Sequence, residues 1–84
     1  MRFDECTLGG YRVFTGALES PLGDGYIAAL FILHSRATPG APREVFRDES
    51  LACGYRWESA EAALAYAMNK SREVIRRHEP LLAA

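Results

Sequence analysis

The sequence predicts an α+β domain in which a three-stranded antiparallel meander precedes one C-terminal helix packed on one face of the sheet. Three observations lead to this fold class. Apolar and small residues recur with the period of a helix in one long segment, at about 59–78. The residues before it fall into strand-like runs separated by turn residues. In the run at about 26–35, both sets of alternate side chains are apolar, which indicates the central strand. The 84 residues suffice for one domain with one small core.

The C-terminal helix is predicted from a stripe of apolar and small side chains at spacings of three and four. Ser59 is a suitable N-cap, and Glu61 places a negative charge in the first turn, where the helix dipole favours it. Pro80 is expected to end the helix because proline lacks the amide donor. His78 is then expected to cap free carbonyls at the helix C-terminus. The stripe consists of Ala60, Ala63, Leu64, Ala67, Met68, Ser71, Val74, Ile75 and His78.

Three strands are expected before the helix, at about 11–19, 26–35 and 43–48. Turn residues at 20–25 separate the first two strands, and the two prolines of 36–42 predict a loop before the third. For the second run, the period alone does not distinguish a strand from a short buried helix. The third run is shorter and more polar, which is typical of an edge strand.

The connector ahead of the helix carries the single tryptophan of the chain. A short strand at 51–53 is one option here, with Gly54 as its exit. Trp57 lies two residues before the expected cap. We expect its ring to pack on the first turn of the helix near Leu64 rather than to face solvent.

The central strand carries more apolar surface than one helix can cover. Alternation divides its side chains into two sets that face opposite sides of the sheet. The candidate protein-interaction face is the set that begins at Tyr26. We expect the uncovered set to be sheltered by the tail at 80–84, by the first three residues, by a second subunit or by a ligand, because soluble monomers rarely expose a contiguous apolar patch. The candidate face consists of Tyr26, Ala28, Leu30 and Ile32.

Charge and composition give no general sign of a nucleic-acid, membrane or secreted protein. The net charge of −1 gives no global attraction to nucleic acid or to an anionic membrane. The longest apolar run, residues 26–33, is far shorter than a membrane span. Acidic residues stand near the N-terminus where a signal peptide needs an apolar core, so a cytoplasmic location is expected. In that reducing compartment Cys6 and Cys53 are expected to be free thiols.

No catalytic, metal or cofactor site is predicted. Both histidines, His34 and His78, are expected to have structural roles, because the sequence places no orienting group beside either. The serines lack a nucleophile-elbow pattern, and the acidic residues lack the alternating spacing of a calcium loop. The turn at 23–25 is too short for a phosphate loop.

A basic set in the second half of the helix suggests an alternative function. If these side chains form one surface, nucleic-acid binding is expected, with tyrosines or Trp57 available for stacking on bases. A simpler explanation is also present, because Glu73 and Arg77 form an i, i+4 pair that supports the helix. The basic set consists of Lys70, Arg72, Arg76 and Arg77.

Three motifs resemble those of small bacterial β-β-β-α domains. Residues 54–67, Gly-Tyr-Arg-Trp-Glu-Ser-Ala-Glu-Ala-Ala-Leu-Ala-Tyr-Ala, are similar to their strand-to-helix junction, where an aromatic residue, a cap and a Glu-Ala pair open the final helix. Tyr-Arg-Val-Phe at 11–14 and Gly-Tyr-Ile-Ala at 25–28 extend the similarity to about residues 9–78. The resemblance implies this fold and a bacterial cytoplasmic protein, and it carries no functional residues.

The order of the elements is also similar to the sheet and last helix of double-stranded RNA-binding domains. Those domains have a leading helix and a basic cluster at the start of the last helix. Here residues 1–10 are too short and glycine-ended for that helix, and Glu58 and Glu61 occupy the start of the last one. The likeness is one of topology and implies no shared function.

Taken together, these features predict a non-enzymatic protein-interaction module. A protein partner or a homodimer is expected, through the second face of the sheet or through the edge strand at 43–48. Nucleic-acid binding by the basic end of the helix is the alternative.

Overall fold

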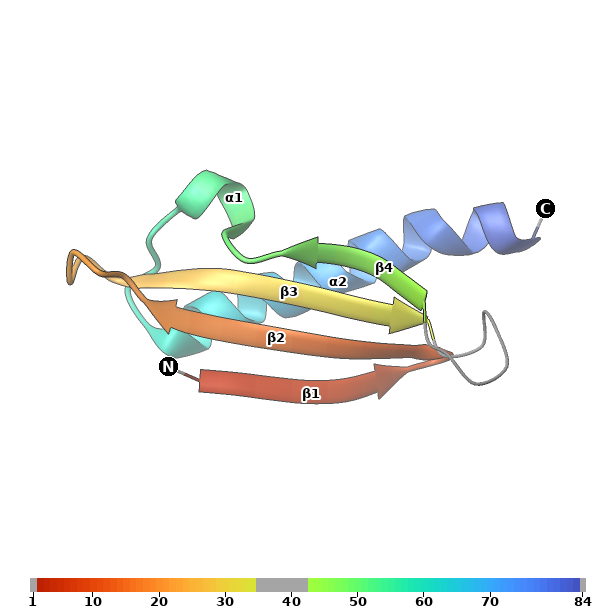
Figure 1. Cartoon of the computed structure of the whole chain (residues 1–84), viewed down its shortest axis with the longest axis horizontal. Helices are drawn as coiled ribbons and strands as arrows, with labels where there is room; N and C mark the ends of the chain where they lie inside the picture. Colours follow the sequence, from red (N-terminus) through yellow and green to blue (C-terminus); the bar gives the residue numbers. More distant parts are fainter. Residues whose placement is uncertain (1, 35–42, 84) are drawn as a thin grey trace.

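The chain folds into a four-stranded antiparallel sheet with one long helix laid across it (Figure 1). The computed structural model describes residues 2–34 and 43–83, the last five of them as backbone. The predicted α+β class, with an antiparallel sheet and a C-terminal helix, is confirmed. In order, the elements are β1 (Arg2–Leu8), β2 (Tyr11–Glu19), β3 (Tyr26–His34), β4 (Arg43–Asp48), α1 (Leu51–Gly54) and α2 (Ala60–Ala83).

The sheet has one strand more than predicted, because residues 2–8 form β1 at its edge. β1 pairs with β2 from Arg2 opposite Ala17 to Leu8 opposite Tyr11. Most of its side chains are exposed, and Cys6 and Leu8 are the two that pack against the core. A polar edge strand lacks the apolar alternation by which a strand is recognised in sequence.

The three predicted strands are present. β2 and β4 have the predicted bounds, β3 ends at His34, and the option of a buried helix at 26–33 is excluded. The strands lie in sequence order, so β3 pairs with β2 on one side and β4 on the other, while β4 forms the second edge. The loop predicted at 36–42 lies outside the described residues.

The option of a short strand at 51–53 is wrong. These residues form α1, a single turn in which Ala52 and Cys53 have left-handed backbone angles, with φ of 53° and 56°. The turn lets Leu51 point into the core, where it is 1% exposed, and Cys53 is an exposed free thiol. Left-handed backbone is disfavoured for residues with a Cβ, so propensity gives no indication of this turn.

The start of α2 is as predicted, and its end is not. Ser59 caps the helix: its Oγ accepts a hydrogen bond from the amide of Ala62 at 3.1 Å, and Glu61 lies in the first turn. The helix continues through Pro80 to Ala83 instead of stopping before it. Proline removes one backbone hydrogen bond, and the three residues after it, two leucines and an alanine, are good helix formers. In the described part of the chain, no helix combines the length and the apolar character that crossing a bilayer requires.

The core lies between α2 and one face of the sheet. The predicted helical stripe is confirmed: Ala63, Ala67 and Ser71 are fully buried, with Leu64 and Ile75 nearly so. Small side chains let the helix backbone approach the sheet closely, and the Ser71 hydroxyl donates to the Met68 carbonyl oxygen at 2.6 Å. From the sheet, the core receives Tyr11, Val13, Thr15, Ala17, Ala28, Leu30 and Ile32.

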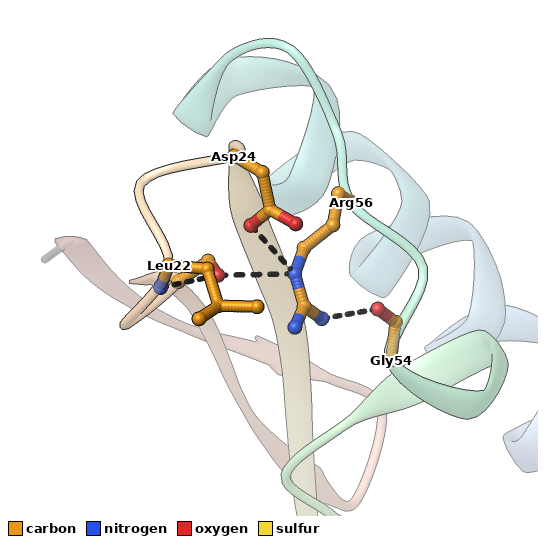
Figure 2. A network of polar contacts seen from close by, with 5 residues as sticks. Leu22, Asp24, Gly54 and Arg56 are labelled. Carbon is orange, nitrogen blue, oxygen red and sulfur yellow. Dashed lines mark hydrogen bonds and ion pairs between the residues drawn. The ribbon is translucent and has the colours of Figure 1, made fainter.

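The segment before α2 is tied to the β2–β3 turn by an arginine (Figure 2). The Nε of Arg56 donates to Ser20 Oγ at 3.1 Å and to Asp24 Oδ1 at 3.0 Å, and its Nη1 donates to the Gly54 carbonyl oxygen. The Ser20 hydroxyl also accepts from the Leu22 amide at 3.2 Å. The hydrogen bond with Ser20 and then the Arg56 guanidinium hold the pKa of Asp24 below its ordinary value of 3.8.

Next to this network the backbone of Trp57 extends the sheet at the start of β3. Trp57 and Tyr26 exchange two backbone hydrogen bonds, each 2.9 Å long. Gly25 permits this approach, since a Cβ there would lie 2.5 Å from the Trp57 carbonyl oxygen, and its φ is +130°. The indole ring packs on α2 as predicted, but its contact there is Tyr66, with centroids 4.7 Å apart, rather than the first turn, and it also lies 4.7 Å from the ring of Tyr55.

We expect Leu30→Ala and Leu33→Ala to differ in their cost, although the two residues lie on the same strand. Leu30 is 2% exposed beneath α2, so its truncation should lower the free energy of unfolding by about 2–5 kcal/mol. Leu33 is on the opposite face and partly exposed, so its truncation should lower the free energy of unfolding by less than about 1 kcal/mol. Urea denaturation of both variants at one protein concentration measures the difference. Equal losses would contradict this assignment of the two faces.

We expect the contribution of Asp24 to stability to depend on pH. Its pKa is lower in the folded chain than in the unfolded one, so the contribution is present above pH 3.8 and is lost as the pH falls through the folded value. Asp24→Asn should therefore be less stable than the parent at neutral pH, and the difference should shrink as the pH falls below 3.8 toward the lowered pKa of the folded chain. Urea midpoints between pH 7 and pH 3 measure it, with Arg56→Gln as the matched change on the other partner. A difference that is constant with pH would contradict the assignment.

Candidate functional site

The structure places the predicted interaction face under the helix. Ala28, Leu30 and Ile32 are between 0% and 2% exposed in the core, and Tyr26 packs partly buried against it. The sequence-based assignment therefore selected the wrong face of β3. The physical reason is that the central strand is apolar on both sides, so its alternation does not distinguish the face on which the helix packs.

The opposite face of the sheet, which we call the open face, is apolar. Its apolar side chains come from β1, β2 and β3, and among the described residues no second layer covers it (Figure 1). The expectation that one face of the central strand would lack a helical cover therefore holds for the part of the chain that is described. The uncharged residues that form the centre of the open face are Phe3, Phe14, Gly16, Leu18, Ile27, Ala29, Phe31 and Leu33.

An aromatic row crosses the centre of the open face. The register aligns Glu5 with Phe14, Phe14 with Phe31, and Phe31 with Arg47, so one residue of each strand contributes. The two phenylalanine rings lie 5.7 Å apart and 30° from parallel. Directly opposed aromatic side chains on neighbouring strands stabilise the sheet and also concentrate apolar area at one point.

The guanidinium of an arginine lies over each ring of the row. The guanidinium of Arg12 lies 5.4 Å from the centroid of Phe14, and that of Arg47 lies 4.4 Å from the centroid of Phe31. Each is also paired with carboxylates: Arg12 Nε donates to Glu5 Oε2 at 3.1 Å, and Arg47 Nε to Glu44 Oε1 at 3.1 Å. The open face thus has an apolar centre and, on both sides, charges of both signs.

Beside the row the open face is hollowed. Gly16 creates the space, and the ring of Phe3 lies over it, so that a Cβ on Gly16 would be 2.9 Å from the ring. Phe3 nevertheless remains 61% exposed, so its ring covers the open face only in part. The hollow measures about 400 Å³ and is lined by Phe3, Phe14, Thr15, Gly16, Ala29, Leu30, Phe31, Arg47 and Glu49.

The four basic residues of α2 do not form one surface. Lys70 and Arg77 flank Glu73, with nitrogen–oxygen distances of 3.7 and 2.9 Å. Arg72 and Arg76 line a separate hollow of about 340 Å³ beside the β1–β2 turn. Two helical positions correspond to about 200° of rotation, so Lys70 and Arg72 project from opposite flanks of the helix.

The structure brings together the two histidines, which are 44 positions apart in sequence. Ring centroids lie 4.6 Å apart for Tyr11 and His34, 5.9 Å for Tyr11 and His78, and 5.8 Å for the two imidazoles. His78 is not at the helix C-terminus, because α2 runs on to Ala83, so the predicted capping role is wrong and packing of the rings replaces it. Among the residues described, no group of three or more His, Cys, Asp and Glu side chains is arranged to hold a metal ion.

Comparison with protein-family models, with curated proteins and with solved structures found no match to this chain.

Proposed function

We propose that this domain is a non-enzymatic protein-interaction module that binds a protein partner through the open face of its sheet. The observation that carries the proposal is the aromatic row with the hollow beside it, on a face that no described element covers. A solvated sheet face normally carries polar side chains, whereas here seven of its positions are apolar on three strands. A contiguous apolar surface of this kind marks an interaction site.

The side chains around the row support a protein partner in particular. Aromatic residues and arginine are enriched at protein–protein interfaces, where arginine contributes both a flat apolar surface and hydrogen-bond donors. Arg12 and Arg47 are already stacked on Phe14 and Phe31, so little side-chain entropy is lost when they are covered. Their neighbours Glu5 and Glu44 balance the charge, which is typical of a polar rim.

Nucleic-acid binding has less support. It requires a surface of one sign that follows a phosphate backbone. The positive side chains of α2 project from opposite flanks, and the net charge of the chain is −1. The strongest remaining feature for that function is the pair Arg72 and Arg76 at one hollow, and a pair makes few phosphate contacts.

The proposal is tested with a photo-cross-linking amino acid introduced at Leu33 on the open face, in cells that make the full chain. Ala65, exposed on the outer side of α2, is the matched control position. We expect protein adducts from position 33 and none above background from position 65. Adducts of equal yield from both positions, or from neither, would overturn the proposal.

A second variant tests whether the adducts form through the aromatic row. Phe31→Ala removes its central ring, which at a binding hot spot weakens association by about 2 kcal/mol, or roughly 30-fold. The yield at position 33 should fall accordingly, while circular dichroism shows the fold retained. An unchanged yield would mean that the row is not the binding surface.

A further inference from the structure

We infer that the protein covering the open face is a second copy of this chain, packed face to face about a two-fold axis parallel to the strands, with β1 of each copy over β4 of the other. This inference rests on the proposed function and names the partner of the same surface. It follows from the order of the residues in the row across the sheet.

The row reads Glu5, Phe14, Phe31, Arg47 from β1 to β4. It has a carboxylate at one end, a guanidinium at the other and aromatic rings in the middle, while Arg12 pairs with Glu5 and Glu44 pairs with Arg47 beside it. Both end residues lie on the open face, since Glu5 bonds to Arg12, which stacks on Phe14, and Arg47 stacks on Phe31. Such a row is complementary to itself when it is reversed.

A two-fold axis between β2 and β3, parallel to the strands, performs that reversal. Glu5 of one copy then faces Arg47 of the second copy, and Phe14 faces Phe31, and each contact occurs twice because the interface is isologous. An axis perpendicular to the strands would instead place Glu5 against Glu5 and Arg47 against Arg47, and like charges in an interface are costly. Of these two arrangements, the first is the one in which the end residues of the row meet opposite charges.

The charged ends remain available for these contacts. The side chains of Glu5 and Arg47 are 46% and 53% exposed, although each has a partner within its own chain. A carboxylate has about four acceptor positions and a guanidinium five donors, so each forms a further bond without losing the first.

The same rotation accounts for the hollow and for the exposed Phe3. The next row contains Phe3, Gly16 and Ala29, from β1 to β3. Reversal places Phe3 of the second copy toward the Ala29 side of that row, where the hollow of about 400 Å³ is lined by Ala29, Phe31 and Glu49. A ring that is 61% exposed in the single chain thereby becomes covered.

The area is enough for a weak dimer. Four strands spaced about 4.8 Å apart, with about eight residues each rising about 3.3 Å, present a face of about 500 Å². Two such faces bury about 1,000 Å² together, near the lower limit for a specific interface. We therefore expect a dimer whose population depends on concentration, with the strands of the two copies at about −30° as in aligned sheet packing.

The inference is tested by sedimentation equilibrium of the full chain between about 1 and 500 µM, a range that covers micromolar dissociation constants. The parent should change from monomer to dimer. Glu5→Arg and Arg47→Glu should each weaken the dimer by at least about tenfold, because each places like charges together twice. An equimolar mixture of the two variants should associate as the parent does, because both contacts in the mixed dimer pair opposite charges.

The double variant E5R/R47E should dimerise more tightly than either single variant, and circular dichroism checks its fold, because the exchange also breaks the pairs of Glu5 with Arg12 and of Arg47 with Glu44. A parent that is monomeric throughout, a dimer that neither single change weakens, or a mixture no tighter than its components would each overturn the inference. Together with the cross-linking experiment, the outcomes separate two failures. A monomer whose position 33 captures another protein refutes the second copy alone, whereas a monomer without adducts refutes the proposed function as well.

Discussion

A sheet has two faces, and the described part of this chain forms one helix long enough to cover one of them. The two inner strands, β2 and β3, are apolar on both sides, so the packing of α2 leaves a second apolar surface. Burial of one face supplies the core that stabilises the fold, and the same arrangement creates the open face. The other features of the molecule, from the arginine stacks to the exposed Phe3, relate to how that second surface is sheltered from water.

Small side chains contribute to the packing of α2 on the face that it covers. A helix packs closely on a sheet where both contribute small residues, and here Ala63, Ala67 and Ser71 of α2 meet a face that includes Ala17 and Ala28. The opposite side of the same strands carries two phenylalanines and several branched aliphatic residues. Large aromatic rings are well suited to contact another flat protein surface.

Two groups of interactions hold the chain in the order that this packing needs. The Arg56 network joins the β2–β3 turn to the segment before α2, and the backbone pairing of Tyr26 with Trp57 fixes where that segment leaves the sheet. The Ser59 cap then starts the helix directly after this point. Because these contacts lie at one end of the sheet, they set the direction in which α2 crosses it (Figure 1).

The sequence by itself determined the elements with a clear period: β2, β3, β4, the capped start of α2, the buried stripe of that helix, and the surplus of apolar residues on the central strand. It gave no sign of β1, of the left-handed turn at Ala52 and Cys53, or of a helix continuing past Pro80, since alternation and propensity are weak or contrary there. Only the tertiary structure decided which face α2 covers and which residues form the row from Glu5 to Arg47. The physical reason is that periodicity reports the two sides of a strand equally, whereas register and burial come from contacts between residues far apart in the chain.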